Sequence, residues 1–446
     1  RQMEMLEVPR PEITDKRDVL IKLSRVGVCG SDVHYYTKGH IGSRVVEYPF
    51  TVGHESAETV AAVASAVTRF HAGDPVAIDP AMPCGECDQC RQGRAHTCRD
   101  MHFLGCPGQA EGSLSEYIVM PEDSCFPLRS AGSMEDGALS ESVAIGVYAC
   151  QLAGALRGKR VAILGADPIG LSVLLSAYAA GVDRVYITDR IKERLRVAER
   201  CGADWCGNPD SEDIVATISE RESLLLDFLF ECCDQQEAID QAMALLKPGG
   251  KLLLIGIPET ERISFEMDAM RRKEICIQNV RRQNGCASKT IQMLEDSALD
   301  ARAMVTHRFP FERAKEASDL VTEYGGGGVK ARTQILPPPP TPRTCAGRTA
   351  PFRREPRHRA SQLDPKPHGL PRERQRTPHS RRDDRRTTGL ERLELRSAKP
   401  FRHAPGRARS AEQLDSFTNS PARFGRLPHR DTRRENRSLR ARRLRV

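Results

Sequence analysis

Short apolar runs separated by turn residues fill the first 145 residues of the chain. Residues 19–23, 74–78 and 115–120 form three such runs, and glycines and prolines lie between them. Runs of this length that are bounded by turn formers are typical of β-strands. The pattern therefore predicts a mostly β domain over residues 1–145.

From about Gly158 onward, strand-like apolar runs alternate with stretches of helical periodicity. The helical stretches include residues 169–180 and 236–246. The strand-like runs are residues 160–164, 184–188, 226–230, 251–255 and 275–279. Strands and helices in alternation form βαβ units on a parallel sheet. The pattern therefore predicts an α/β domain that begins at about residue 158.

This pattern ends after Val329, where the composition also changes. Residues 1–336 contain 38 Lys and Arg against 49 Asp and Glu, whereas residues 337–446 contain 30 against 11. The second segment opens with four consecutive prolines and has few aromatic side chains. Such a composition cannot bury enough apolar surface to offset the entropy lost on ordering. We therefore expect residues 337–446 to form a disordered, Arg- and Pro-rich tail.

The composition also narrows the classes of function. The cations of the tail could bind the phosphates of a nucleic acid, but its 11 acids and its lack of Tyr and Trp argue against that role. The sequence has no apolar stretch of about 18 residues, as a membrane span needs, and we expect no secretory signal. Most of the 15 cysteines are scattered singly, which favours reduced thiols and metal ligands over a disulfide framework. We expect a cytoplasmic protein that binds neither membrane nor nucleic acid.

Four cysteines lie close together in the first domain. Cys84, Cys87, Cys90 and Cys98 have the spacing C-x2-C-x2-C-x7-C. Zinc prefers four thiolates in a tetrahedron, and close pairs on a tight loop supply that geometry. Because four protein ligands leave no open coordination position, we expect this zinc to be structural.

A second group of zinc donors occurs earlier in the chain. Cys29 lies in the sequence GVCGSD, and His54 and Glu55 follow in GHE. Together they offer sulfur, nitrogen and oxygen donors, all of which zinc accepts. With at most one further protein ligand, the site keeps a position for water or substrate, as catalytic zinc sites do.

These motifs together resemble the zinc-containing medium-chain dehydrogenases. The similarity rests on GVCGSD followed by GHE, on the four cysteines and on VAILGADPIG, in this order over about residues 1–332. CGSDVHYY and VTHRFPFERAKEA look most like sorbitol, xylitol and related polyol dehydrogenases. The resemblance implies a GroES-like catalytic domain over residues 1–145 that residues 281–336 complete, and a Rossmann domain over residues 146–280. It also implies two zinc ions and NAD in each subunit, and a homodimer or homotetramer.

In that family, zinc acts as a Lewis acid on the substrate alcohol, and a hydride passes to the nicotinamide. The resemblance implies that Cys29, His54 and Glu55 are zinc ligands or lie next to the ligands. Glu141, in LSESVAIG, matches an acidic residue that reaches the metal directly or through water.

The resemblance also assigns the proton path and the substrate contacts. Ser31 would take the proton of the alcohol and pass it through the cofactor ribose to His34. The substrate hydroxyls would be held by Tyr35, Arg281 and Arg282. Arg282 stands where the animal sorbitol enzymes usually have tyrosine, which leaves the identity of the substrate open.

A dinucleotide-binding fingerprint opens the second domain. The sequence GADPIG, residues 165–170, follows a predicted strand and begins a helix, as the pyrophosphate-binding turn does. Asp189 ends the next predicted strand, where a carboxylate binds the ribose diol and repels a 2′-phosphate, so the sequence favours NAD over NADP. With the residues that the resemblance adds, the cofactor-binding set comprises Gly165, Asp167, Pro168, Ile169, Gly170, Asp189, Arg194, Ile257 and Val280.

Four further residues depart from the family pattern. Asp167 replaces the glycine that lets the backbone approach the pyrophosphate. A carboxylate about 5 Å from a phosphate, at an effective dielectric near 20, would weaken cofactor binding by roughly 3 kcal/mol. That is about a hundredfold in affinity unless the side chain turns to solvent. Glu58 replaces a glycine near the metal ligands and would need a partner or a proton if buried. Ser142 replaces a proline, and Asp234 stands where the family usually has glycine.

The sequence therefore predicts a zinc-dependent dehydrogenase that oxidises a polyol or secondary alcohol to a ketose or ketone with NAD. An enzyme like L-threonine 3-dehydrogenase shares the zinc and cofactor motifs and is an alternative. A catalytically impaired member of the family is a further alternative, because several of the departures lie in the predicted sites.

Overall fold

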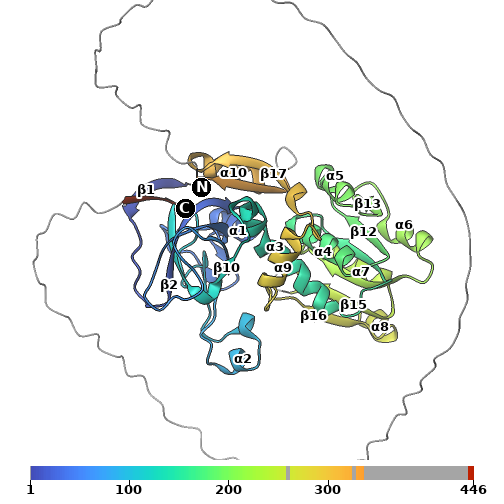
Figure 1. Cartoon of the computed structure of the whole chain (residues 1–446). Helices are drawn as coiled ribbons and strands as arrows, with labels where there is room; N and C mark the ends of the chain where they lie inside the picture. Colours follow the sequence, from blue (N-terminus) through green and yellow to red (C-terminus); the bar gives the residue numbers. More distant parts are fainter. Residues whose placement is uncertain (1, 258–261, 324–327, 336–439) are drawn as a thin grey trace, which may run out of the picture. The chain divides into compact units, whose positions relative to one another are not determined.

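The computed structural model describes residues 2–257, 262–323, 328–335 and 440–446 (Figure 1). These residues build one large sheet of seven strands and another of six. The helix α3 (Met134–Ala153) contacts strands of both sheets. Within the described ranges, no helix is long and apolar enough to cross a membrane.

The seven-stranded sheet forms the core of the first domain. Its strand order is β10-β6-β5-β2-β18-β17, and β9 also pairs with β2. Val19, Ile21 and Leu23 are buried on β2, as the period of two in the sequence requires. The strands are β2 (Asp18–Gly27), β5 (Glu55–Val63), β6 (Pro75–Ile78), β9 (Tyr117–Pro121), β10 (Cys125–Pro127), β17 (Val305–Pro310) and β18 (Lys330–Gln334). Residues beyond 281 thus add two strands to the sheet that the first 145 residues build.

The six-stranded sheet is parallel throughout, with the order β13-β12-β11-β14-β15-β16. Its strands are β11 (Arg160–Leu164), β12 (Arg184–Thr188), β13 (Trp205–Gly207), β14 (Leu226–Glu231), β15 (Leu246–Leu254) and β16 (Cys276–Asn279). The helices between them in the chain are α4 (Pro168–Ala179), α5 (Lys192–Arg200), α6 (Ile214–Arg221), α7 (Gln236–Leu245) and α8 (Met267–Arg272). This is the predicted Rossmann fold, in which ligands bind at the carboxyl ends of the strands where the strand order reverses, here between β11 and β14.

The helix α3 packs closely on α4 because it lacks a side chain at one point. A Cβ atom on Gly146 would lie 2.4 Å from the backbone carbonyl group of Ser172, so only glycine permits this approach. Residue 145, where we place the boundary between the two domains, lies inside α3. The helix also carries Glu141, and the packing of α3 on elements of both domains fixes the position of that carboxylate.

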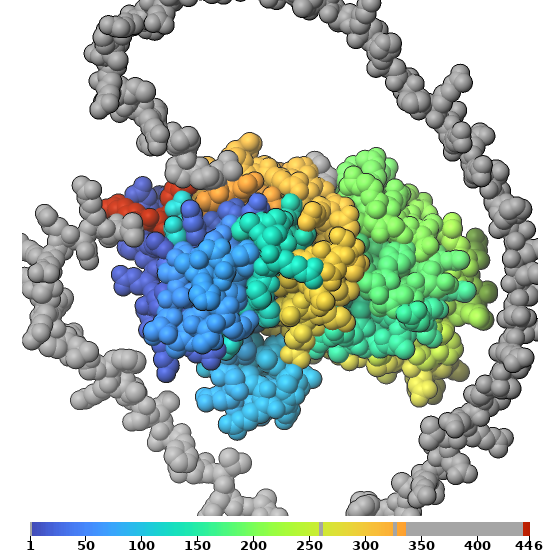
Figure 2. Space-filling model, viewed as in Figure 1, coloured from blue at the N-terminus to red at the C-terminus, as the bar shows by residue number. Residues whose placement is uncertain are grey.

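The remaining elements lie outside the two large sheets. The helices are α1 (Gly30–Lys38), α2 (Asp88–Arg91), α9 (Ala287–Glu295) and α10 (Ala314–Thr322). Two short antiparallel pairs join β3 (His40–Ile41) to β4 (Arg44–Val45) and β7 (Ala81–Met82) to β8 (His102–Phe103). The lobe around α2 projects from the surface in Figure 2, where it is light blue.

The C-terminal end of the chain corrects the expectation of a wholly disordered tail. The strand β19 (Arg440–Arg445) pairs antiparallel with β1 (Glu4–Pro9) over six residues, and the two strands lie side by side in Figure 1. Leu444 is buried, and Arg442 forms an ion pair with Glu116 at 2.7 Å. Residues 440–446 are therefore ordered, because a neighbouring strand and a buried contact compensate for their composition. The rest of the predicted tail lies outside the described residues.

Replacing Leu444 with Ala is expected to lower the free energy of unfolding by about 2–3 kcal/mol, because a buried leucine leaves a cavity when it is truncated. Urea denaturation measures the change. Arg440→Ala on the same strand is the matched control, because its ion pair with Glu7 is exposed and should matter by less than about 1 kcal/mol. Equally small effects of both substitutions would show that β19 does not dock on β1.

Candidate active site and metal sites

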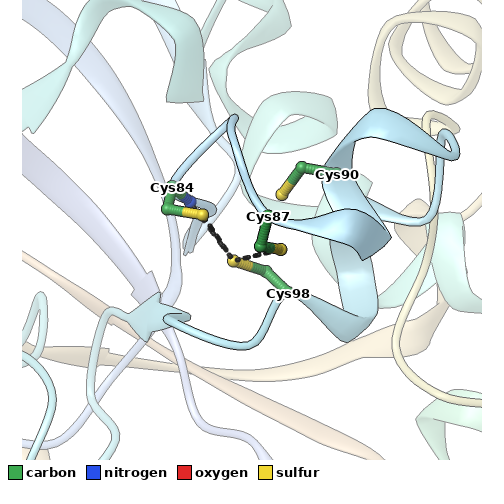
Figure 3. Close-up of side chains that lie close together, drawn as sticks. All are labelled: Cys84, Cys87, Cys90 and Cys98. Carbon is green, nitrogen blue, oxygen red and sulfur yellow. Dashed lines mark hydrogen bonds between the residues drawn. The ribbon is translucent and has the colours of Figure 1, made fainter.

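The four clustered cysteines converge in the lobe around α2. The sulfur atoms of Cys84, Cys87, Cys90 and Cys98 lie within 4.8 Å of one another (Figure 3). Backbone N–H groups, led by that of Arg99, lower the pKa of Cys87 to about 6, which favours the thiolate that a metal binds. Four converging thiols fit one tetrahedral zinc ion and leave no open position on it.

Cys29, His54 and Glu55 are brought together by the pairing of β2 with β5. Cys29 follows the end of β2 and is the N-cap of α1, while His54 precedes β5 and Glu55 begins it. The ligand atoms of these three residues lie within 4.8 Å of one another. Gly27 opposes Glu55 in the ladder, and a Cβ atom on it would lie 2.1 Å from Oε2 of Glu55. The glycine therefore makes room for the carboxylate.

Asp32 positions Cys29, Gly53 and His54 relative to one another. Its carboxylate accepts hydrogen bonds from the backbone N–H groups of Cys29 and Gly53, at 3.0 and 2.9 Å, and lies 3.3 Å from Nδ1 of His54. Burial raises the pKa of Asp32, but His54 and the two N–H groups outweigh it, and the net shift is downward. The carboxylate of Asp32 therefore stays ionised beside Nδ1 of His54, and Nε2 is the ring nitrogen of His54 that remains for a metal.

Lys330 partners Glu55 in the buried interior. Its Nζ atom lies 2.6 Å from Oε1 of Glu55, and both side chains are buried. Burial lowers the pKa of Lys330, but Glu55 and Cys29 outweigh it, so the net shift is upward and the ammonium group stays charged. Oε2 of Glu55 and Oε2 of Glu141 are buried without a hydrogen-bond partner, and burial raises the pKa of Glu141 to about 7. Carboxylate oxygens that lack a donor, beside a thiol and an imidazole, fit a zinc ion.

A cavity of about 1270 Å³ joins this metal group to the second domain. Besides the metal group, the predicted site residues that line it are Ser31, His34, Tyr35, Glu141, Gly165, Asp167, Pro168, Ile169, Asp189, Arg194, Ile257, Val280, Arg281 and Arg282. Gly170 does not line the cavity, and a Cβ atom on it would lie 1.8 Å from the carbonyl oxygen of Gly165. It thus permits the close packing of turn and helix that the fingerprint requires. The structure brings the metal, cofactor and substrate candidates to one continuous space.

Asp167 caps the helix α4 with its own side chain. Its Oδ1 atom accepts hydrogen bonds from the backbone N–H groups of Ile169 and Gly170, at 3.0 and 2.8 Å. N–H groups in this position are those that a helix N-terminus offers to a bound phosphate. Burial raises the pKa of Asp167, although Arg194 opposes the shift. The side chain therefore does not turn to solvent, and a carboxylate occupies the donors of the turn.

Asp189 lies at the end of β12 and holds the fingerprint turn from the other side. Its carboxylate accepts hydrogen bonds from the backbone N–H groups of Ala166 and Ile191, both at 2.8 Å. Arg194 lies 3.5 Å from the same carboxylate. A carboxylate in this position suits the ribose diol of a dinucleotide. The residues present thus fit a dinucleotide, except at Asp167.

The other departures from the family pattern have local explanations. Glu58 lies 3.6 Å from Arg25, and burial raises its pKa. The hydroxyl of Ser142 donates to the carbonyl oxygen of Leu139 at 3.3 Å, so it is satisfied within α3. Asp234 adopts a φ of 56°, a left-handed conformation that glycine adopts more readily. Glu58 and Ser142 are accommodated, whereas Asp234 keeps a backbone suited to glycine.

Three residues of the site were not predicted from the sequence. Asp32 could have been found, because it follows Cys29 by three residues and an acid at that point of a helix reaches back to the cap. Lys330 is 275 residues from Glu55, and its local sequence does not indicate this pairing. Phe103 lies against His54, with 5.6 Å between the ring centroids, and nothing in the local sequence indicates this contact.

Comparison with known proteins agrees with this geometry. Residues 15–130 match the model of the alcohol dehydrogenase GroES-like domain, and residues 168–298 match that of the zinc-binding dehydrogenases. A sorbitol dehydrogenase of Bacillus subtilis is 34% identical over 327 residues, which are 73% of this chain and 92% of the relative. The chain belongs to the zinc-containing medium-chain dehydrogenase family.

Two further comparisons agree with this result. The L-idonate 5-dehydrogenase of Vitis vinifera is 31% identical over 317 residues, or 70% of this chain and 86% of the relative. A protein from Escherichia coli CFT073 described as a short chain alcohol dehydrogenase, and solved with NADH, superposes with a TM-score of 0.67 at 25% identity, and the match covers 74% of this chain and 98% of that one. As a medium-chain dehydrogenase, the chain is an oxidoreductase of the alcohol dehydrogenase type, as the sequence predicts.

Proposed function

We propose that the chain is a zinc-dependent dehydrogenase that oxidises a polyol or secondary alcohol to a ketose or ketone with NAD. The observation that carries this proposal is that Cys29, His54 and Glu55 face the same cavity as the fingerprint turn and Asp189. An alcohol at the metal group and a nicotinamide from the second domain would share that cavity.

When bound, zinc would polarise the alcohol oxygen, and NAD would accept the hydride. Cys29, His54 and Glu55 would hold the catalytic zinc, with Glu141 reaching it directly or through water. Asp32 fixes the ring of His54, and Lys330 balances the charge of Glu55. The four-cysteine lobe would hold a second, structural zinc.

Ser31 and His34 are placed to move the proton of the alcohol. Both lie on α1 directly after Cys29, and both line the cavity. A hydroxyl group can accept the proton while it donates its own, and an imidazole that titrates near neutral pH can deliver a proton to solvent. Both side chains are half-buried, which suits a path from the cavity to the surface.

We propose NAD in preference to NADP, because the carboxylate of Asp189 would repel a 2′-phosphate. Arg194 lies beside Asp189 and offsets part of this charge. The relatives named for sorbitol and L-idonate make polyols and their acids the first substrates to test. By resemblance to the family we also propose a cytoplasmic homodimer or homotetramer.

Absorbance of NADH, measured with a panel of sorbitol, xylitol, ribitol, threonine and simple alcohols, tests the proposal. We expect turnover on a polyol that a zinc chelator abolishes. Cys29→Ala should remove one zinc ion and the activity, and Cys90→Ala should remove the other zinc ion. Turnover on threonine alone would favour the alternative enzyme, and a folded, zinc-loaded protein that oxidises none of these compounds would contradict the proposal.

A further inference from the structure

Arg282 brings a guanidinium group into the cavity from the segment that follows β16. Its φ of 53° is a left-handed conformation that few side chains adopt. The guanidinium lies over the ring of Phe103, with 3.6 Å between Cζ and the ring centroid. The other neighbour of this ring is His54, at 5.6 Å between centroids. One aromatic ring therefore separates the cation from a candidate zinc ligand.

In the described part of the chain, the guanidinium group of Arg282 has a nitrogen without a bonded partner. Its Nη1 atom is buried and has no hydrogen-bond partner among the described residues. Burial, together with the neighbouring Arg281, lowers the pKa of Arg282 to about 10, so the group is still protonated at neutral pH. Glu141 and Asp79 act on it through space, without a hydrogen bond. A half-buried cation with a buried, unbonded nitrogen is stabilised by an anion that brings its own oxygen atoms.

We propose that Arg282 binds an anionic group of the substrate, the carboxylate or phosphate of an acidic sugar alcohol. A guanidinium group meets two oxygens of such an anion at once. An uncharged polyol would leave the N–H groups of Arg282 without a strong acceptor. The inference rests on the proposed function, because it names the substrate class of the same site.

Packing on Phe103 does not by itself account for this arginine. A ring interacts with the face of the guanidinium, whereas the N–H groups lie in its plane and point elsewhere. The unbonded Nη1 atom, which lies at the cavity that the substrate would enter, is therefore available to a ligand.

Calorimetric titration of the zinc-loaded protein with gluconate, sorbitol 6-phosphate and sorbitol tests the proposal. These compounds share one carbon skeleton and differ in charge. We expect one of the anions to bind at least about tenfold more tightly than sorbitol, Arg282→Gln to remove this preference and Arg282→Lys to restore part of it. Arg313→Gln, which breaks a surface pair with Glu316, is the control for the same change in net charge.

The anion whose affinity falls further in Arg282→Gln identifies the group that the arginine binds. Equal binding of all three compounds by the unsubstituted protein, or an anion preference that survives Arg282→Gln, would overturn the proposal. The titration needs no turnover, so its result is separate from the proposed function. A preference lost in Arg282→Gln in a protein that oxidises no alcohol would contradict only the proposed function, and polyol oxidation without any preference would contradict only the role of Arg282.

Discussion

Replacing Lys330 with Met is expected to lower the free energy of unfolding by about 3–5 kcal/mol. In the protein, the ammonium group lies 2.6 Å from Glu55, and both side chains are buried. The substitution removes the cation and leaves the carboxylate where water cannot solvate it. Urea denaturation of the zinc-loaded protein, with the zinc content measured in parallel, gives the change.

Two further variants show whether the pair itself is responsible. Adding Glu55→Gln to Lys330→Met should recover part of the lost stability, because the amide carries no charge. Lys315→Met breaks a surface pair with Asp319 and should change the free energy of unfolding by less than about 1 kcal/mol. If Lys330→Met costs no more than Lys315→Met, a group other than Lys330 compensates the charge of Glu55.

Five of the six strands of the second sheet could be predicted because each of them is a short apolar run in the sequence, whereas the three-residue strand β13 was not predicted. The apolar runs 160–164 and 184–188 coincide with β11 and β12. The convergence of the four thiols could also be predicted, because ligands spaced two residues apart on one loop can bind one metal ion without help from distant segments. Cys29 and His54 needed one further condition, which is that β2 and β5 pair, and neighbouring strands commonly do so.

Lys330 and β19 could not be predicted, because their partners are distant in the chain. Lys330 meets Glu55 across 275 residues. The composition of the tail conceals β19, in which Ala441 and Leu444 are buried, while Arg442 finds an acidic partner. The average composition of the tail indicates that ordering the whole tail would cost too much entropy. It does not indicate that six of its residues pair with β1.

The direction of the Asp167 side chain also could not be predicted from the sequence. The pattern GADPIG places a carboxylate near the pyrophosphate but leaves open whether it turns to solvent. In the structure, Asp167 turns inward and accepts from the N–H groups of Ile169 and Gly170. The donors that a phosphate would use therefore already hold an anion. Asp167 would compete with the cofactor for these donors as well as repel its charge.

Asp167→Gly is expected to tighten NAD binding by about a hundredfold, since it removes roughly 3 kcal/mol of repulsion. The stability of α4 should change by only a few tenths of a kcal/mol, because glycine is itself tolerated as an N-cap. Calorimetric titration with NAD, for the unsubstituted protein and the variant at the same ionic strength, measures the gain.

Asp167→Asn separates the charge from the occupied donors. Its amide oxygen can still cap α4 but carries no charge, so part of the gain should appear. Because burial raises the pKa of Asp167, lowering the pH should neutralise the side chain and tighten NAD binding by the unsubstituted protein. This dependence on pH should disappear in Asp167→Gly. No gain in either variant would mean that Asp167 costs the cofactor nothing, because its side chain leaves the turn freely when the dinucleotide binds.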